Sequence, residues 1–247
     1  MNFIENWFHN SIADGGLLLL LDPDRGSPSK LAGMAKDAVA AGIDAVLVGS
    51  SLLLGDSLES AVREIKSAID APVFLFPGDG NQVTAAADGI LFLSLVSGRN
   101  PRWLIEEQVE TAPRIRKLGL PALPTAYMLI ESGRVTAVQF MSATVPIPRN
   151  KPEIAVAHAI AAEMLGLKAI FLEAGSGAEM SVPPEVVAGV RAVCDLPLIV
   201  GGGIRDIETA KAIIDAGADF IVIGTHFEET GDLTLLKEIA ALVHRKK

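Results

Sequence analysis

The sequence predicts an α/β protein, a (β/α)8 TIM barrel with a missing or shortened third helix. Three observations predict this fold: a length of 247 residues, eight short apolar runs bounded by Gly, Pro or Asp, and segments with helical spacing between these runs. Strands that alternate with helices are typical of a parallel sheet, and eight such units occupy about 250 residues in a barrel. We therefore expect residues 1–247 to form a single domain.

The eight apolar runs are the expected strands. They are rich in Leu, Ile, Val and Phe, as strands of a parallel sheet covered on both faces are. In chain order they span Leu17–Asp22, Ala45–Ser50, Val73–Pro77, Gly89–Leu93, Leu123–Leu129, Ala169–Glu173, Leu198–Gly201 and Phe220–Gly224.

Seven segments between the strands are the expected helices. Several have Pro or Asp near the first turn and end at Gly, which is typical of helix ends. They span Ser29–Ala41, Ser57–Ser67, Pro101–Leu118, Pro152–Leu165, Pro183–Val193, Ile207–Ala216 and Leu233–His244. The connection from Pro77 to Gly89 is too short for a helix with two loops. Either a long apolar ligand enters the resulting gap or a short turn covers it.

The segment from Glu131 to Pro148 breaks the alternation after the fifth strand. Glu131-Ser132-Gly133 is typical of a turn, and Arg134–Phe140 alternates between polar and apolar residues like an additional strand. We expect a hairpin or a lid there.

Composition excludes several classes of protein. A formal net charge of −9, with no basic cluster before the last few residues, argues against a nucleic-acid partner. Cys194 is the only cysteine, which excludes an intramolecular disulfide and favours a cytoplasmic location. The apolar run Leu17–Leu21 is far shorter than the roughly 20 residues that cross a bilayer, so we expect no integral membrane segment.

Glycines follow the seventh and eighth strands, as Gly201-Gly202-Gly203 and as Gly224-Thr225. The loops after these two strands commonly bind phosphate in barrels, because glycine lets backbone N–H groups approach the oxygens. A plain tight turn is the alternative, but it does not explain the matching glycine at the partner strand. The pair predicts a phosphate ligand.

The sixth strand ends at Glu173, which is followed by Gly175, Ser176 and Gly177. A carboxylate at this strand end faces the barrel mouth, where it can accept a hydrogen bond or a proton from a substrate hydroxyl. Residues 175–177 can add N–H groups to the phosphate site. Glu173 is therefore the predicted catalytic residue, and stabilisation of a neighbouring loop is the alternative.

Asp22 ends the first strand, and Ser50 and Ser51 end the second. Hard oxygen ligands at adjacent strand ends suit a Mg2+ ion that bridges to a substrate diphosphate. Formation of a turn by Asp22 before Pro23 is the alternative.

Polar and aromatic side chains follow the fourth strand. Arg99 and Asn100 could reach diphosphate oxygens, and Trp103 could line an apolar channel. A surface loop in which Trp103 packs on its own helix is the alternative. Tyr127, the only tyrosine, is either a core residue or a ligand at the rim.

Taken together, these residues resemble the geranylgeranylglyceryl phosphate synthases and their heptaprenyl relatives, in particular the second subgroup of that family. The family often has Tyr where this chain has Phe171, and one branch has Lys where this chain has Leu20. The matching segments occur in order over nearly the whole chain, and they are Leu21–Asp24, Val48–Ser51, Leu75–Gly78, Ser97–Pro101, Pro146–Glu153, Leu172–Gly177, Gly201–Ile204 and Gly224–Thr225.

The resemblance implies sn-glycerol 1-phosphate as acceptor, a prenyl diphosphate as donor, Mg2+ as cofactor, and a homo-oligomer, either a dimer or a hexamer. It implies that Asp22 and Ser51 hold the metal. It implies that the glycerol phosphate is surrounded by Phe171, Leu172, Glu173, Ala174, Gly175, Ser176, Gly177, Gly202, Gly203, Gly224 and Thr225.

We therefore expect a Mg-dependent prenyltransferase that joins a long prenyl group, geranylgeranyl, to the primary hydroxyl of the acceptor. The products would be an ether lipid precursor and diphosphate. Two alternatives stay open: another phosphate-binding barrel enzyme, such as a sugar-phosphate isomerase or an aldolase, and a non-catalytic protein that binds a phosphorylated ligand.

Overall fold

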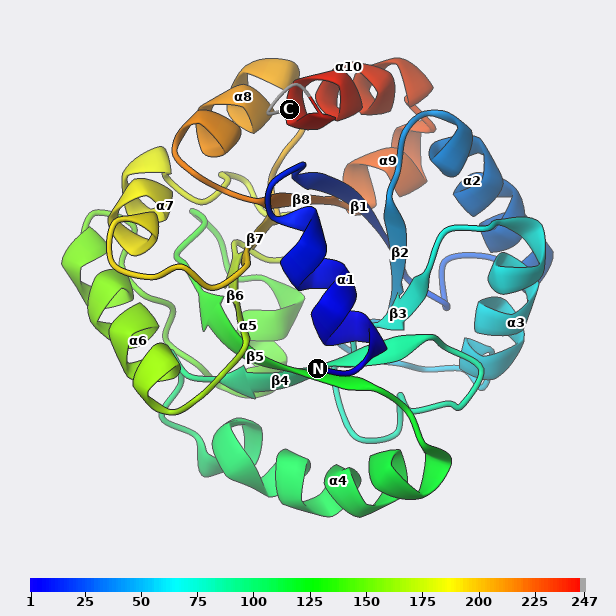
Figure 1. Ribbon diagram of the computed structural model, residues 1–247, viewed down its shortest axis with the longest axis horizontal. Coiled ribbons are helices and arrows are strands. Elements are labelled where there is room, and N and C mark those ends of the chain that lie inside the picture. Colours follow the sequence, from blue (N-terminus) through cyan, green and yellow to red (C-terminus); the bar gives the residue numbers. More distant parts are fainter. Residues whose placement is uncertain (245–247) are drawn as a thin grey trace.

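The computed structural model describes residues 1–244 and confirms the barrel. Eight parallel strands form one closed sheet in chain order, and helices surround it (Figure 1). The end of each strand differs from its expected position by at most two residues. The strands are β1 (Gly16–Leu21), β2 (Ala45–Val48), β3 (Val73–Leu75), β4 (Gly89–Leu95), β5 (Ala122–Leu129), β6 (Ala169–Glu173), β7 (Leu198–Gly201) and β8 (Phe220–Ile223).

The seven expected helices are all present, and the one before β5 begins with a π-helical turn. Within residues 1–244, no helix combines the length and the apolar character that crossing a membrane requires. The helices are α1 (Phe3–Ser11), α2 (Pro28–Ala40), α3 (Leu58–Ala68), the π-helix η1 (Arg102–Glu106), α4 (Glu107–Leu118), α5 (Ala137–Ser142), α6 (Pro152–Met164), α7 (Pro184–Arg191), α8 (Ile207–Asp215), α9 (Thr225–Thr230) and α10 (Leu233–Val243).

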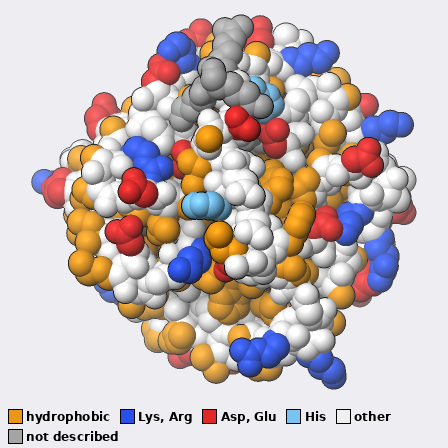
Figure 2. Space-filling view, in the orientation of Figure 1, with side chains coloured by type: hydrophobic (Ala, Val, Ile, Leu, Met, Phe, Trp, Pro, Cys, Tyr) orange, Lys and Arg blue, Asp and Glu red, His pale blue; other side chains and the backbone are white. Residues whose placement is uncertain are grey.

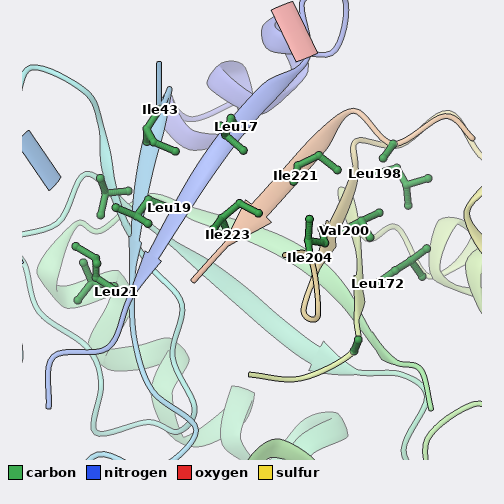
Figure 3. Close-up of a cluster of buried hydrophobic side chains, with 14 of the residues drawn as sticks. Leu17, Leu19, Leu21, Ile43, Leu172, Leu198, Val200, Ile204, Ile221 and Ile223 are labelled. Carbon is green, nitrogen blue, oxygen red and sulfur yellow. The ribbon is translucent and has the colours of Figure 1, made fainter. Parts of the chain in front are cut away.

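Side chains alternate between two hydrophobic layers along each strand. Leu17, Leu19 and Leu21 of β1 belong to the layer between the sheet and the helices, where Figure 3 shows Leu17 and Leu19 near Ile221 and Ile223 of β8. Leu18 belongs to the cluster inside the barrel. This alternation follows from the period of two in a strand, and it leaves both faces of the sheet buried.

Helix α1 closes the barrel at the amino ends of the strands. Its buried residues Ile4 and Phe8 join the inner cluster, and the ring of Phe8 contacts the rings of Phe74 and Phe220 at centroid distances of 5.8 and 4.9 Å. In Figure 1 α1 crosses the centre of the ring. Figure 2, seen from the same side, shows this centre filled and both signs of charge interspersed around it. Ligands must therefore enter at the carboxyl ends of the strands.

The third barrel helix is absent from the described residues, as the sequence predicts. Residues 76–88 contain turns and no helix, and Figure 1 shows loops between α3 and α4. This connection lies directly on the loop after β2, because a Cβ atom added to Gly49 would collide with the backbone of Phe76, and one added to Gly78 with the backbone of Ser50. The outer ring is therefore interrupted between α3 and α4.

The expectation of a hairpin at Arg134–Phe140 is wrong. Residues 134–136 are not helical, residues 137–140 belong to the short helix α5, and an isolated bridge joins Ile130 to Ile147. A closed barrel has no free strand edge with which an additional strand could pair. The segment instead packs Val138 against the inner cluster at the barrel mouth.

Candidate active site

Two adjoining cavities lie at the carboxyl ends of the strands. The larger has a volume of about 320 Å3 and the smaller about 110 Å3. Leu20, Ser176 and Thr225 line both cavities, so these three residues form the wall between them. Ligands in the two cavities would therefore lie next to each other.

The smaller cavity, the amide pocket, is built by the loops after β6, β7 and β8. Its glycines allow a close approach of these loops: a Cβ on Gly202 would lie 2.5 Å from Oε1 of Glu173, and Gly202 and Gly203 have φ angles of 85° and 70°, which favour glycine. It is lined by Leu20, Arg134, Glu173, Ser176, Gly177, Gly202, Gly203, Ile204, Arg205, Val222, Gly224, Thr225, His226 and Glu229.

Backbone donors are the main polar feature of the amide pocket. Within residues 1–244, several backbone N–H groups around the pocket have no hydrogen-bond partner in the protein. Converging N–H groups from glycine-rich loops bind anions, because each contributes a partial positive charge and a hydrogen bond. They include the N–H groups of Ser176, Gly177, Gly202, Gly203 and Gly224.

Glu173 is the buried acid between the pocket and the barrel interior, with 5% of its surface exposed. It follows Ala169 and Phe171 at the period of two, so its side chain leaves β6 on the inner face. Its Oε1 accepts a hydrogen bond from the N–H of Gly175 at 2.5 Å. Burial raises the pKa of Glu173 from 4.5 to about 7, against the opposing effect of the hydrogen bonds from Gly175 and Ala174. A carboxyl with this pKa can exchange a proton near neutral pH.

The larger cavity, the long cavity, runs from the ends of β1 and β2 towards the gap left by the missing helix. Phe76 and Tyr127, whose rings pack against Phe171, line its inner wall, and Trp103 lines it from η1. The lining residues are Leu20, Asp22, Arg25, Gly49, Ser50, Ser51, Leu52, Phe76, Pro77, Gly78, Asp79, Gly80, Val83, Ile90, Leu91, Phe92, Leu93, Leu95, Trp103, Glu107, Gln108, Thr111, Ile115, Tyr127, Ala137, Val138, Met141, Ser142, Ser176, Thr225 and Glu228.

Oxygen atoms gather at the end of the long cavity nearest to the amide pocket. The Ser50 hydroxyl donates to Oδ2 of Asp22 at 2.8 Å, and the Asp22 N–H donates to Oε1 of Glu228 at 2.8 Å. Ser51 lines the same cavity. Burial raises the pKa of Glu228, and its hydrogen bond from Asp22 opposes that rise.

This donor set fits a magnesium ion. Mg2+ is usually bound by one or two carboxylates together with water and substrate phosphate oxygens, and Asp22 with the neighbouring hydroxyls supplies that kind of set. Within the part of the chain that the structure describes, no cluster of three or more His, Cys, Asp or Glu side chains could hold a metal ion by itself. Any ion at Asp22 would therefore depend on substrate oxygens.

Several expected site residues have side chains outside both cavities. The Arg99 guanidinium donates to the carbonyls of Ser97 and Gly98, and the Asn100 amide donates to the carbonyl of Ser142. Leu172 and Ala174 point into the layer beneath the helices, and Phe171 is buried in the barrel interior. The strand period places these last three, since only every second side chain of β6 faces inward.

The structure also places residues at the site that sequence reasoning missed. Arg134, Arg205 and His226 line the amide pocket, and Glu228 lines the long cavity. The segment of Arg134 was expected to be a strand, and the first turn of α9, which carries His226 and Glu228, was not expected at all. His226 and Glu228 follow the glycine motif of β8 directly, and this position is the sequence signal that could have identified them.

Comparison with known proteins agrees with this geometry. The model of the PcrB family matches residues 10–243. The chain is 42% identical to the geranylgeranylglyceryl phosphate synthase of Chitinophaga pinensis over 98% of this chain and 96% of that protein, and 40% identical to that of Methanosphaera stadtmanae over 98% and 99%.

A solved structure extends the similarity to three dimensions. The crystal structure of (S)-3-O-geranylgeranylglyceryl phosphate synthase from Thermoplasma acidophilum, in complex with its substrate sn-glycerol-1-phosphate, superposes with a TM-score of 0.93 at 32% identity, covering 99% of both chains. Because the family model and these relatives span nearly the whole chain, the protein belongs to the PcrB family and groups with the geranylgeranylglyceryl phosphate synthases.

Proposed function

We propose that this protein transfers the geranylgeranyl group of its diphosphate to the primary hydroxyl of sn-glycerol 1-phosphate, forming an ether and releasing diphosphate. One observation carries the proposal: an anion-binding pocket and an apolar cavity share the wall formed by Leu20, Ser176 and Thr225. An enzyme that joins a phosphate ester to a hydrocarbon needs this juxtaposition of sites. The names of its relatives support the choice of both substrates.

The amide pocket suits the phosphate of the acceptor. The free N–H groups of Gly202, Gly203 and Gly177 can bind its oxygens, and Glu173 lies beside Gly202. With the phosphate in this pocket, the glycerol hydroxyls extend towards Glu173 and the shared wall. Of the residues predicted to surround the glycerol phosphate, Ser176, Gly177, Gly202, Gly203 and Gly224 offer free N–H groups, whereas Phe171, Leu172, Ala174 and Gly175 do not line the pocket.

The long cavity suits the prenyl donor. Its diphosphate would lie near Asp22 and Ser51, and its tail would extend past Phe76 towards Trp103 and the gap beside α4. Burial of each CH2 group stabilises binding by about 0.8 kcal/mol, so a long tail needs no specific polar contact. This assignment favours the first of the two open alternatives for the missing helix, in which an apolar ligand occupies the gap.

We also propose that Asp22 and Ser51 hold Mg2+. When bound, the ion would neutralise charge on the diphosphate and make it a better leaving group. The Ser50 hydroxyl, which donates to Oδ2 of Asp22, orients the carboxylate. The N–H of Asp24, which donates to Oδ1 at 2.9 Å, does the same for the other oxygen.

Glu173 is the proposed catalytic base. As the bond between the allylic carbon and the diphosphate oxygen breaks, the acceptor hydroxyl forms the new C–O bond and its proton passes to the Glu173 carboxylate. The fixed N–H of Gly175 donates to Oε1 of Glu173 and so orients the carboxylate. Burial matters here because it brings the pKa of Glu173 to about 7 and so makes it a stronger base than an exposed carboxylate.

The sugar-phosphate aldolase alternative lacks support at the site. A Schiff-base mechanism needs a lysine at the cavity, and among residues 1–244 no lysine lines either cavity. Lys168 is exposed, and its N–H bonds to Pro124 at the start of β6, the end of the strand away from the mouth.

Product analysis tests the proposed function against both alternatives. The protein is incubated with radiolabelled sn-glycerol 1-phosphate, geranylgeranyl diphosphate and Mg2+, and the lipid extract is analysed by chromatography and mass spectrometry. We expect a labelled geranylgeranylglyceryl phosphate. Binding of the acceptor without a labelled lipid would favour a binding protein, and conversion of a sugar phosphate would favour an isomerase or aldolase.

The number of domains, the cellular location and the oligomeric state of the protein stay predictions. Residues 1–247 are proposed to act as a single domain in the cytoplasm, the location that the lone Cys194 favours. The proposed homo-oligomer is supported by exposed apolar side chains after β5, among them Val135, Phe140 and Val145 with 66%, 77% and 84% of their surface exposed. Light scattering of the purified protein would distinguish a monomer from a dimer or a hexamer.

A further inference from the structure

The loop between β5 and α5 forms a wall of the amide pocket. The Met180 N–H donates to the carbonyl of Ser132 at 3.1 Å, and a Cβ added to Gly175 would lie 2.6 Å from the side chain of Thr136. Two residues of this loop therefore contact the segment that follows β6. The residue between them, Arg134, is placed over the same segment.

Arg134 lines the amide pocket, and Nη2 of its guanidinium donates to the carbonyl of Gly177. Within the described residues 1–244, Arg134 forms no ion pair with a carboxylate. A guanidinium has five N–H donors in a planar fork that matches two phosphate oxygens. One bond to a carbonyl leaves most of this capacity unused beside the free N–H groups of Gly177 and Gly202.

The charges around the pocket favour a cationic ligand for a dianion. Glu173 and Glu229 line the pocket, and the chain has a formal net charge of −9, so the surroundings repel phosphate. Backbone N–H groups offer only partial charges. The other guanidinium at the pocket, that of Arg205, already donates to two carbonyls, those of Ala178 and Glu179, at 2.6 and 3.4 Å.

We infer that Arg134 is the cationic ligand of the phosphate group in the amide pocket. On binding, its guanidinium would exchange the bond to Gly177 for a pair of charge-assisted bonds to two phosphate oxygens, while the N–H groups of Gly202 and Gly203 hold the remaining oxygens. Arg134 thereby selects a phosphorylated acceptor and holds the β5–α5 loop against it. This inference rests on the proposed function for the identity of the ligand.

Calorimetric titration with inorganic phosphate and with sn-glycerol 1-phosphate tests the inference. Arg134→Gln is expected to raise the Kd of both ligands at least tenfold, and Arg134→Lys to fall between Arg134→Gln and the unchanged protein. Arg116→Gln removes the same charge from the exposed last turn of α4 and is the matched control, for which no change is expected. Arg205→Gln is the competing variant at the same pocket.

Steady-state kinetics add a readout that loop packing alone would not produce. Arg134→Gln should raise the KM of the acceptor by the same factor as its Kd and leave kcat at saturating acceptor within twofold. The Kd of phosphate should also rise less steeply with added salt in Arg134→Gln than in the original protein, because one charge contact is lost.

The inference would be overturned by a folded Arg134→Gln protein whose phosphate Kd is within twofold of the original. It would also be overturned by a loss of affinity that Arg116→Gln shares or that only Arg205→Gln shows. A fall in the kcat of Arg134→Gln with an unchanged KM would overturn it as well. Phosphate binding is measured without a prenyl donor. A chain that binds phosphate through Arg134 yet makes no ether would therefore refute the proposed function alone.

Discussion

Gln82 and Ser50 are joined by two hydrogen bonds: the Ser50 N–H donates to Oε1 of Gln82 at 2.9 Å, and Nε2 of Gln82 donates to the Ser50 carbonyl at 2.8 Å. Gln82 lies in the connection that replaces the missing helix and is 1% exposed. The Ser50 hydroxyl in turn holds the Asp22 carboxylate. The loop that leaves the long cavity open therefore also positions the proposed metal ligand.

Gln82→Leu is expected to lower the free energy of unfolding and weaken the response to Mg2+. It leaves two polar groups of Ser50 without partners, at a cost of roughly 1–3 kcal/mol for each that stays buried. The Mg2+ concentration for half-maximal activity should rise severalfold, and Mn2+ binding followed by electron paramagnetic resonance should weaken in parallel. Gln82→Glu keeps the acceptor for the Ser50 N–H and should be intermediate. Unchanged Mn2+ binding in folded Gln82→Leu would contradict this role.

Glu173→Gln is expected to lower kcat by roughly 100-fold or more, the usual contribution of a general base, with a small effect on acceptor affinity. In the original protein, activity should rise with pH through about 7, as the Glu173 carboxyl loses its proton. Steady-state rates from pH 5.5 to 8.5 measure both effects. Glu179→Gln, an exposed change in the neighbouring loop, is the control. If Glu173→Gln has a kcat close to that of the original protein, Glu173 is not the general base.

The same carboxyl should make stability depend on pH. The pKa of Glu173 is raised in the fold, so the native state holds its proton more tightly than the unfolded chain and loses stability as pH rises from 4.5 to about 7. A shift of that size, at about 1.4 kcal/mol per pH unit, amounts to about 3 kcal/mol. Urea unfolding should therefore show Glu173→Gln to be more stable than the original protein at pH 8, with the advantage vanishing near pH 4. An equal difference at both pH values would contradict the assignment.

Gly202→Ala is expected to abolish acceptor binding. The new methyl group would lie 2.5 Å from Oε1 of Glu173, and the φ angle of 85° disfavours any residue but glycine. Gly33→Ala is the matched control: Gly33 lies in α2, and its added Cβ would meet no atom within 4 Å. It should bind the acceptor normally and be up to about 1 kcal/mol more stable, because alanine favours helix. Calorimetry with sn-glycerol 1-phosphate compares the two variants.

Trp103→Ala should extend the range of prenyl donors. Removal of the indole enlarges the long cavity beside α4, so longer tails can be buried at about 0.8 kcal/mol per CH2. Competition between geranylgeranyl diphosphate and a donor of about twice its length measures the effect as a ratio of kcat/KM. Trp7→Phe, at the opposite end of the barrel in α1, should leave that ratio unchanged. If the kcat/KM ratio in Trp103→Ala equals that of the original protein, the prenyl tail does not lie beside Trp103.

The local pattern of residues predicted the elements that hold the site. Each strand is a short apolar run because both of its faces must be buried, and the lengths of the runs and connections identified eight strands and the missing helix between β3 and β4. Helix α1 was missed, although Asn2 and Glu5, which form its capping box, are visible in the sequence.

By itself, the sequence determined the barrel, the glycine loops and the position of Glu173, because these follow from the period of side chains along single segments. Only the tertiary structure decided that Ser50 is the residue that bonds to Asp22, that Gln82 holds Ser50 across 32 positions of the chain, and that Arg134 meets Gly177 across 43. Such pairs depend on how distant segments approach when the sheet closes. That approach is set by the packing of the whole barrel, so no local pattern encodes it.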